Sequence, residues 1–167
     1  MEVIVLRLIH VLGGIVWVGG AAFNAFFLIP AMASAGPSAG PVMAGLQRRR
    51  MMTVLPIVAL LTILSGIRLL MIRGAMAPAY FQSTQGMTFS IAGGIAILAF
   101  VVGWVLVRPA MMKAGQLAAA QATAPESERA SMGAEIGRLR RRGAIGNTVV
   151  TYAVFLAAAG MAVARYL

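Results

Sequence analysis

Residues 8–30 read LIHVLGGIVWVGGAAFNAFFLIP, a run of 23 residues that contains no charged side chain. An α-helix needs about 20 apolar residues to cross about 30 Å of hydrocarbon, so this run is long enough to span a membrane. It is longer than the apolar core of a signal peptide, and it lacks both a basic segment before it and a cleavage site of small residues. We therefore interpret it as a retained membrane-spanning helix.

Three further runs, residues 51–72, 88–107 and 143–163, are also long and apolar, and Arg68 is the one charged residue in them. Of the 167 residues, 60% are hydrophobic and 11% are charged, against about 45–50% and about 25% in a soluble domain. One soluble core of this size could not bury so much apolar surface. The sequence therefore predicts an all-α polytopic membrane protein, a single transmembrane domain over residues 1–167 in which four helices form an up-down bundle.

Basic residues are distributed unevenly between the connecting segments. The segments before the second span and between the third and fourth spans contain ten of the fourteen Lys and Arg residues. Positively charged loops stay in the cytoplasm, so we expect both termini on the opposite side. This predicts a multi-pass protein of the bacterial cytoplasmic (inner) membrane with periplasmic N- and C-termini. The clustering in loops also argues against nucleic acid as a partner of this chain, despite its net charge of +10.

The polar segment between the third and fourth spans has a second half with helical features. Pro125 precedes Glu126 and Glu128, and four arginines follow about three turns later. Acidic residues at the start and basic residues at the end of a helix both complement its dipole. We expect a cytoplasmic amphipathic helix over about residues 125–142, anchored to anionic lipid by Arg138, Arg140, Arg141 and Arg142.

One stripe of the first span combines polar and small residues. His10, Trp17 and Asn24 recur every seven residues, which places them on one side of a helix. Small residues let a neighbouring helix backbone approach closely, and a polar side chain in lipid needs a partner inside the bundle. We expect this stripe to face inward, with packing positions at Gly13, Gly14, Gly20 and Asn24.

The single histidine, His10, has two open interpretations. Imidazole is a common ligand of haem iron and copper, which makes His10 a candidate metal ligand. Alternatively, His10 is a buried histidine hydrogen-bonded to a helix or to an interfacial group. One histidine cannot form a bis-histidine haem site within one chain, and the twelve methionines can equally fill gaps in helix packing.

Two other polar features lie in the spans. Arg68, near the outer end of the second span, either extends to the lipid headgroups or faces inward and binds an anionic group such as a haem propionate or lipid phosphate. A polar patch at the start of the fourth span is explained by ordinary hydrogen bonding between helices. This patch contains Asn147, Thr148, Thr151 and Tyr152.

No pattern in the sequence indicates catalysis. Cysteine is absent, which excludes disulfides, thiolate metal sites and cysteine nucleophiles. No acidic residue lies inside a span, so a carboxylate proton relay has no carrier. Neither a nucleotide-binding loop nor a nucleophile with its base is visible. We therefore predict that the protein is not an enzyme.

A family resemblance adds to these inferences. The segment LIHVLGGIVWVGG at residues 8–20, followed by Phe23 and Pro30, resembles the first helix of small proteins related to the copper resistance protein D superfamily. Residues 48–50, 64–66 and 161–167 are also similar to uncharacterised four-helix members. The resemblance implies a helical bundle with His10 and Trp17 near the outer face, and copper or haem handling. Copper-transporting relatives are larger and have further histidines, which this chain lacks.

Three functions are consistent with the sequence. The first is a non-enzymatic accessory or scaffold subunit of a larger respiratory or photosynthetic membrane complex, with lipid and other membrane subunits or further copies of itself as partners. The second is a haem- or copper-binding protein that uses His10. The third is a small transporter, which the lack of acidic residues inside the spans disfavours.

Overall fold

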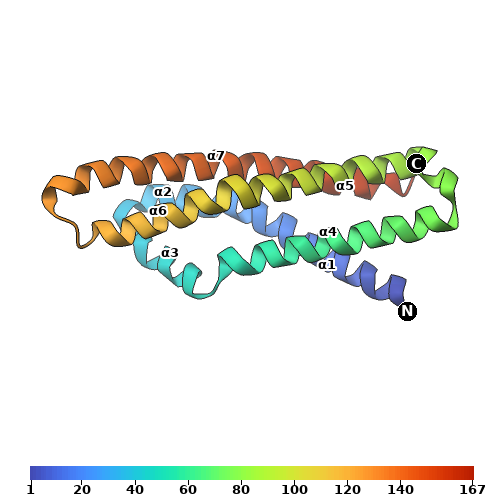
Figure 1. Ribbon diagram of the computed structural model, residues 1–167, viewed down its shortest axis with the longest axis horizontal. Helices are drawn as coiled ribbons and strands as arrows, with labels where there is room; N and C mark the ends of the chain where they lie inside the picture. The colour runs from blue at the N-terminus through green and yellow to red at the C-terminus, as the bar shows by residue number, and fades with distance from the viewer.

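The computed structural model describes the backbone of residues 1–167 and all side chains except those of Pro37, Ala75, Met76 and Pro78. Four helices in it are long and apolar enough to cross a membrane (Figure 1), and the backbone so described contains no strand. The chain is therefore an all-α multi-pass membrane protein, as the sequence predicts. The four long helices are Glu2–Ala35, Met51–Gly74, Thr84–Gln121 and Glu126–Ala164.

Short turns, written η, interrupt or connect the α-helices. Two of them, η1 and η4, are π turns inside long helices, whereas η2 and η3 are 3₁₀ turns in connections. In chain order the elements are α1 (Glu2–Phe23), η1 (Asn24–Leu28), α2 (Ile29–Ala35), η2 (Gly36–Ser38), α3 (Ala39–Arg48), α4 (Met51–Met76), η3 (Pro78–Gln82), α5 (Thr84–Val102), η4 (Gly103–Val107), α6 (Arg108–Gln121) and α7 (Glu126–Ala164).

The bundle is built from two helix pairs, α1 with α4 and α5–α6 with α7. Both chain ends lie at one end of the molecule, which we call the terminal end, and the turn between α6 and α7 lies at the other, which we call the arm end (Figure 1). From the terminal end, α1 runs beside α4 and then crosses toward α7. The pairs join in a core of mostly small side chains around Trp17, Ala21, Ala59, Ala99 and Val154.

A buried hydrogen bond joins the pairs at this crossing. Thr151 of α7 is fully buried, and its hydroxyl lies 3.1 Å from the carbonyl oxygen of Ala21 and 2.8 Å from that of Asn147. The contact to Ala21 connects α7 to α1. The hydrogen bonding between helices that the sequence predicts for the polar patch is thus confirmed at Thr151.

The third long helix does not end at Pro109, where the sequence predicts the end of a span. It continues through Pro109 to Gln121, because η4 precedes the proline. A proline inside an α-helix lacks its own N–H and clashes with the carbonyl four residues earlier, and a wider π turn changes the register so that the helix continues. The first long helix uses the same device, with η1 just before Pro30.

The predicted cytoplasmic helix and the fourth span are one continuous helix, α7. Its 39 residues extend about 58 Å, roughly twice the thickness of the hydrocarbon. Glu126 and Glu128 occupy its first turn, as expected. The dipole argument for Arg138 to Arg142 is wrong, because these residues lie in the middle of α7, where the backbone carbonyls are bonded within the helix.

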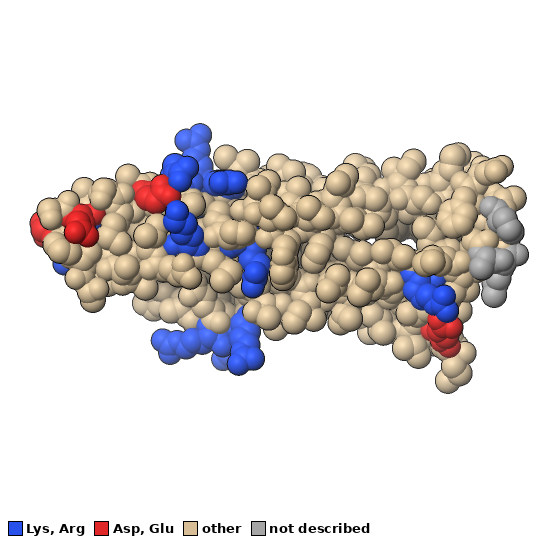
Figure 2. Space-filling view, viewed as in Figure 1, with Lys and Arg blue, Asp and Glu red and all other residues tan. Residues whose placement is uncertain are grey.

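Together α6 and the first part of α7 form an antiparallel hairpin, which we call the arm (residues 108–142). Ala110, Ala114 and Leu139 are buried between its two helices. Its turn is closed by side chains, since Gln121 Nε2 donates to the Arg129 carbonyl at 2.7 Å and Arg129 Nε donates to the Ala124 carbonyl at 2.9 Å. On the face shown in Figure 2, most basic side chains gather in a belt around the base of the arm.

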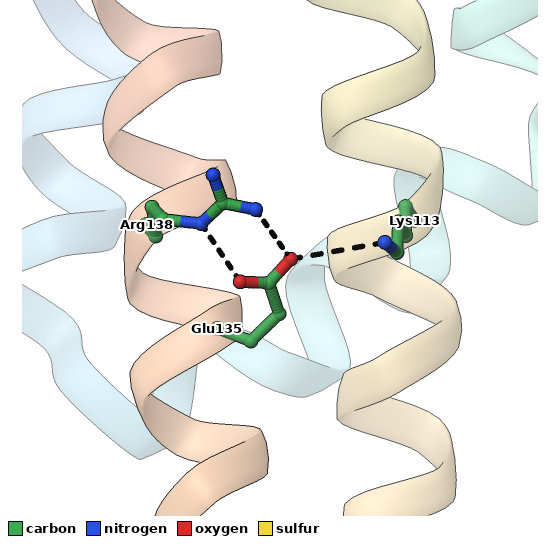
Figure 3. A network of polar contacts seen from close by, with 3 residues as sticks. All are labelled: Lys113, Glu135 and Arg138. Carbon is green, nitrogen blue, oxygen red and sulfur yellow. Dashed lines mark hydrogen bonds and ion pairs between the residues drawn. The ribbon is translucent and has the colours of Figure 1, made fainter.

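Glu135 is the centre of an ion-pair network that joins the arm's two helices (Figure 3). Arg138 donates to both of its carboxylate oxygens at 2.8 Å, and Lys113 of α6 lies 3.7 Å away. The hydrogen bonds from Arg138, followed by the positive charges of Arg138 and Lys113, lower the pKa of Glu135. The same hydrogen bonds raise the pKa of Arg138.

A pH dependence of arm stability follows from the lowered pKa of Glu135. Its ionised form stabilises the folded arm above the ordinary carboxyl pKa of about 4.3, and this contribution is lost as the pH falls through the lower folded-state pKa. The hydrogen-exchange protection factors of the α6 and α7 amides, which correct for the slower intrinsic exchange in acid, should therefore fall with pH in the native protein but less in Glu135→Gln. Glu128→Gln, at a glutamate without an ion pair in the described part of the chain, is the control and should behave as the native protein does.

Candidate functional site

His10 is bonded to α4. Its Nδ1 lies 2.7 Å from the carbonyl oxygen of Thr62. A carbonyl can only accept, so Nδ1 donates, and in the neutral ring Nε2 is the nitrogen with a free lone pair. The ring lies against Gly66, because a methyl group at Gly66 would be 2.6 Å from His10 Cε1. This geometry is that of a histidine hydrogen-bonded to a neighbouring helix, one of the two predicted interpretations.

The glycines of the predicted stripe pack against α4. A methyl group at Gly13 would collide with the Thr62 hydroxyl, and one at Gly20 would lie 3.0 Å from Leu55. Gly14 has more room, with Thr62 Cγ2 at 3.9 Å from such a methyl group. The close approach of α1 and α4 therefore depends on Gly13 and Gly20.

Arg68 pairs with Glu2 at the terminal end of the bundle. Its Nε donates to the Glu2 carboxylate at 2.8 Å, and the two side chains are 53% and 57% exposed. A pair exposed to this extent contributes little to stability. The geometry favours the surface interpretation of Arg68 over an inward-facing anion site beside His10.

The described residues around His10 provide no cluster of carboxylate or imidazole ligands for a metal ion. Among the described residues, no group of three or more His, Cys, Asp or Glu side chains could hold a metal ion. Trp17 lies two turns away in the buried core between the helix pairs. His10, Trp17 and Arg68 therefore do not converge on one point, and His10 Nε2 is the single nitrogen ligand on offer.

A cavity of about 450 Å³ lies between the two helix pairs at the arm end. Both π turns border it, η1 through Asn24 and Leu28 and η4 through Gly103, Trp104 and Val107. Its volume is in the range typical of ligand sites. Most of its wall is apolar and includes the flexible side chains of Met32, Met43, Met51, Met52 and Met111.

The polar residues that line the cavity are basic or neutral. Arg108 lies at the start of α6 with its guanidinium 4.5 Å from the centre of the Trp104 ring. Neither Arg108 Nε nor Asn147 Nδ2 has a hydrogen-bond partner in the described part of the chain, although both atoms are buried. None of the lining residues is acidic. The polar members are Asn24, Gln47, Arg108, Arg140, Arg141 and Asn147.

The four arginines predicted to anchor the protein to lipid have different positions. All four are exposed. Arg140 and Arg141 line the cavity, and Arg138 binds Glu135. Arg142 neither lines the cavity nor forms an ion pair with a described residue. Two of the four arginines therefore line the cavity, one binds within the arm, and Arg142 does neither.

Sequence reasoning found part of this cavity and missed the rest. Trp17 and Asn24 belong to the predicted inward stripe, and both line it. Arg108 was counted only for its charge, and Asn147 was explained by hydrogen bonding between helices, which its unpartnered Nδ2 does not support. The sequence signal that could have indicated the cavity is a pair of prolines, Pro30 and Pro109, each near one end of an apolar run. In the structure a π turn precedes each of them.

Comparisons with family models, curated proteins and solved structures found no match for this chain. The resemblance to the copper resistance protein D superfamily therefore stays a prediction. The geometry described above is the basis for the functional proposals that follow.

Proposed function

We propose that this chain is a non-enzymatic accessory or scaffold subunit of a larger membrane complex, of the respiratory or photosynthetic kind, in a bacterial inner membrane. The basic belt at the base of the arm supports an arm that points into the cytoplasm, with both termini in the periplasm. Ten of the fourteen basic residues belong to the two segments on that side.

The arm is the observation that carries this proposal. If the apolar part of α7 begins near residue 143, the 17 residues from Glu126 onward extend about 25 Å beyond the membrane. A buried seam, the closed turn and the Glu135 network hold the two helices of the arm together. A preorganised helical surface loses little entropy on binding, which suits it to contact a partner subunit outside the membrane.

Glycines with open space around them mark further contact surfaces. A methyl group at Gly19 of α1, Gly94 of α5 or Gly137 of α7 would meet no atom within 4 Å apart from the adjoining residues of its own helix. Small residues on the outside of a membrane helix allow another helix to approach closely. Each of these glycines can therefore be enlarged without disturbing the fold, unlike Gly13 and Gly20.

These positions give a direct test. The tagged chain is purified from its native membranes in mild detergent, and the co-purifying proteins are identified by mass spectrometry. We expect a defined set of larger subunits with the unaltered chain. Gly19→Ile, Gly94→Ile and Gly137→Trp probe three faces, and at least one should reduce the recovered partner about tenfold or more, because bulk at a packed helix contact prevents close approach.

Controls separate partner loss from unfolding. Each variant should keep the thermal stability of the isolated chain, since its new side chain points into open space. His10→Ala should retain the partner, because His10 bonds within the chain. Purification of the chain without any stoichiometric partner, or full partner recovery in all three variants, would contradict the proposal.

The tautomer of His10 supports a second candidate function, haem or copper binding. Metal-ligating histidines commonly donate one ring N–H to a carbonyl and bind metal with the other nitrogen, as Nδ1 and Nε2 of His10 could. A second ligand would come from another copy or subunit. A haem absorbance band or stoichiometric copper that is lost in His10→Ala would support this candidate, and a colourless, metal-free complex would exclude it.

A further inference from the structure

We propose that the cavity between η1 and η4 binds one anionic phospholipid from the membrane leaflet at the arm end. Its phosphate would lie at Arg108 and Asn147, and part of an acyl chain would fill the apolar wall beside Trp17. This inference concerns a ligand site and does not depend on the proposed accessory role.

The polar groups of the cavity favour a ligand with a negative charge. Arg108 Nε and Asn147 Nδ2 are both hydrogen-bond donors, and both are buried without a partner in the described chain. A buried donor without an acceptor costs about 1–3 kcal/mol, so an acceptor on a ligand would be stabilising. With Arg140 and Arg141 on the same wall and no acidic lining residue, the acceptor that fits is negatively charged.

The position and wall of the cavity select an amphiphile over a free ion. The donors line the same cavity as Arg140 and Arg141 of the basic belt, and anionic headgroups attract Arg and Lys at the membrane surface. Beyond them the wall is apolar, and methionine side chains adapt to a flexible chain. A free phosphate would leave this apolar volume unfilled, whereas a phospholipid uses both parts of the site.

The position of Arg108 is set by its neighbours. Its guanidinium lies over the Trp104 ring, and Trp104 also stacks on Phe100 with ring centres 6.0 Å apart. A guanidinium held against an aromatic face keeps its N–H groups free for a phosphate. Because η4 contains Trp104 and directly precedes Arg108, the π turn places both residues at the cavity.

The two tryptophans of the chain make this site measurable. Both line the cavity, but Trp17 is only 9% exposed whereas Trp104 is 46% exposed. Phenylalanine keeps an aromatic face for Arg108. In Trp104→Phe the remaining tryptophan fluorescence comes from Trp17, and bromine atoms on an acyl chain quench it only at close range. Delipidated protein in detergent micelles is titrated with phosphatidylglycerol that has dibrominated chains. We expect saturable quenching with one lipid bound per protein.

Variants of the donors test the headgroup position. Arg108→Gln should raise the half-saturating lipid concentration about tenfold, because it removes a charge-assisted hydrogen bond. Asn147→Leu keeps the size of the side chain and should weaken binding less, which provides a second test if Arg108→Gln folds poorly. Arg142→Gln is the matched control, since Arg142 neighbours Arg141 in sequence but does not line the cavity, and its binding should be unchanged.

Other occupants give different results. Quenching that rises without saturation, or an equal effect of Arg108→Gln and Arg142→Gln, would overturn the proposal. Equal binding of brominated phosphatidylcholine would remove the selection for a negative headgroup, and inorganic phosphate that stabilises the protein fully by itself would show an ion site. Quenching that disappears as the chain dimerises would assign the cavity to a second copy. Each of these results would contradict phospholipid binding as proposed.

Discussion

Replacing Gly86 by alanine is expected to destabilise the terminal end of the bundle by on the order of 3 kcal/mol. A methyl group there would collide with the carbonyl oxygen of Tyr80 and would lie 2.8 Å from its carbonyl carbon and 3.2 Å from Phe81 Cα. These are main-chain atoms of η3, so they cannot move aside as a flexible side chain can. The measurement is the free energy of unfolding in detergent, followed by circular dichroism.

The same helix provides the control for this substitution. A methyl group at Gly93 or Gly94 would meet no atom within 4 Å. Alanine there should leave stability unchanged or raise it by up to about 1 kcal/mol, since alanine favours helix over glycine. A large loss of stability at Gly86 with no loss at Gly94 would establish the close packing of η3 on α5. A loss no larger at Gly86 than at Gly94 would show that this packing is wrong.

The second large effect is expected at Gly66 and depends on His10. A methyl group at Gly66 would be 2.6 Å from His10 Cε1 and 2.9 Å from Nδ1. Gly66→Ala should therefore push the ring away from α4, break the bond to the Thr62 carbonyl and cost about 2–3 kcal/mol. His10→Ala alone should cost about 1–2 kcal/mol, mainly the lost hydrogen bond and contacts of the ring.

A double-mutant cycle separates this contact from general damage. With His10 already replaced by alanine, the ring is gone and the new methyl group at Gly66 has room. Gly66→Ala should then cost less than about 0.5 kcal/mol, which gives a coupling of about 2 kcal/mol between the two positions. Thermal or denaturant unfolding of the four proteins measures it. Additive losses would mean that His10 does not lie against Gly66.

The four membrane spans could be predicted because their signal is local. A run such as residues 8–30 must face lipid wherever the chain places it, and its length alone decides that it can cross the membrane. Part of the cavity lining could also be predicted, since the seven-residue spacing of Trp17 and Asn24 places them on the inward stripe. The sequence thus determined the fold class, the number of long apolar helices and the inner face of the first one.

Helix ends and the cavity were decided by the tertiary structure. Whether Pro109 ends a helix depends on the register before it, and the π turn at η4 lets α6 continue and form the arm with α7. Arg108 and Asn147 are 39 positions apart, and only the packing of α5–α6 against α7 places both at the cavity beside Asn24 of η1. Sequence patterns report which side of one helix is apolar. The cavity between the two helix pairs depends on the contacts between them, and no single segment of the sequence encodes those contacts.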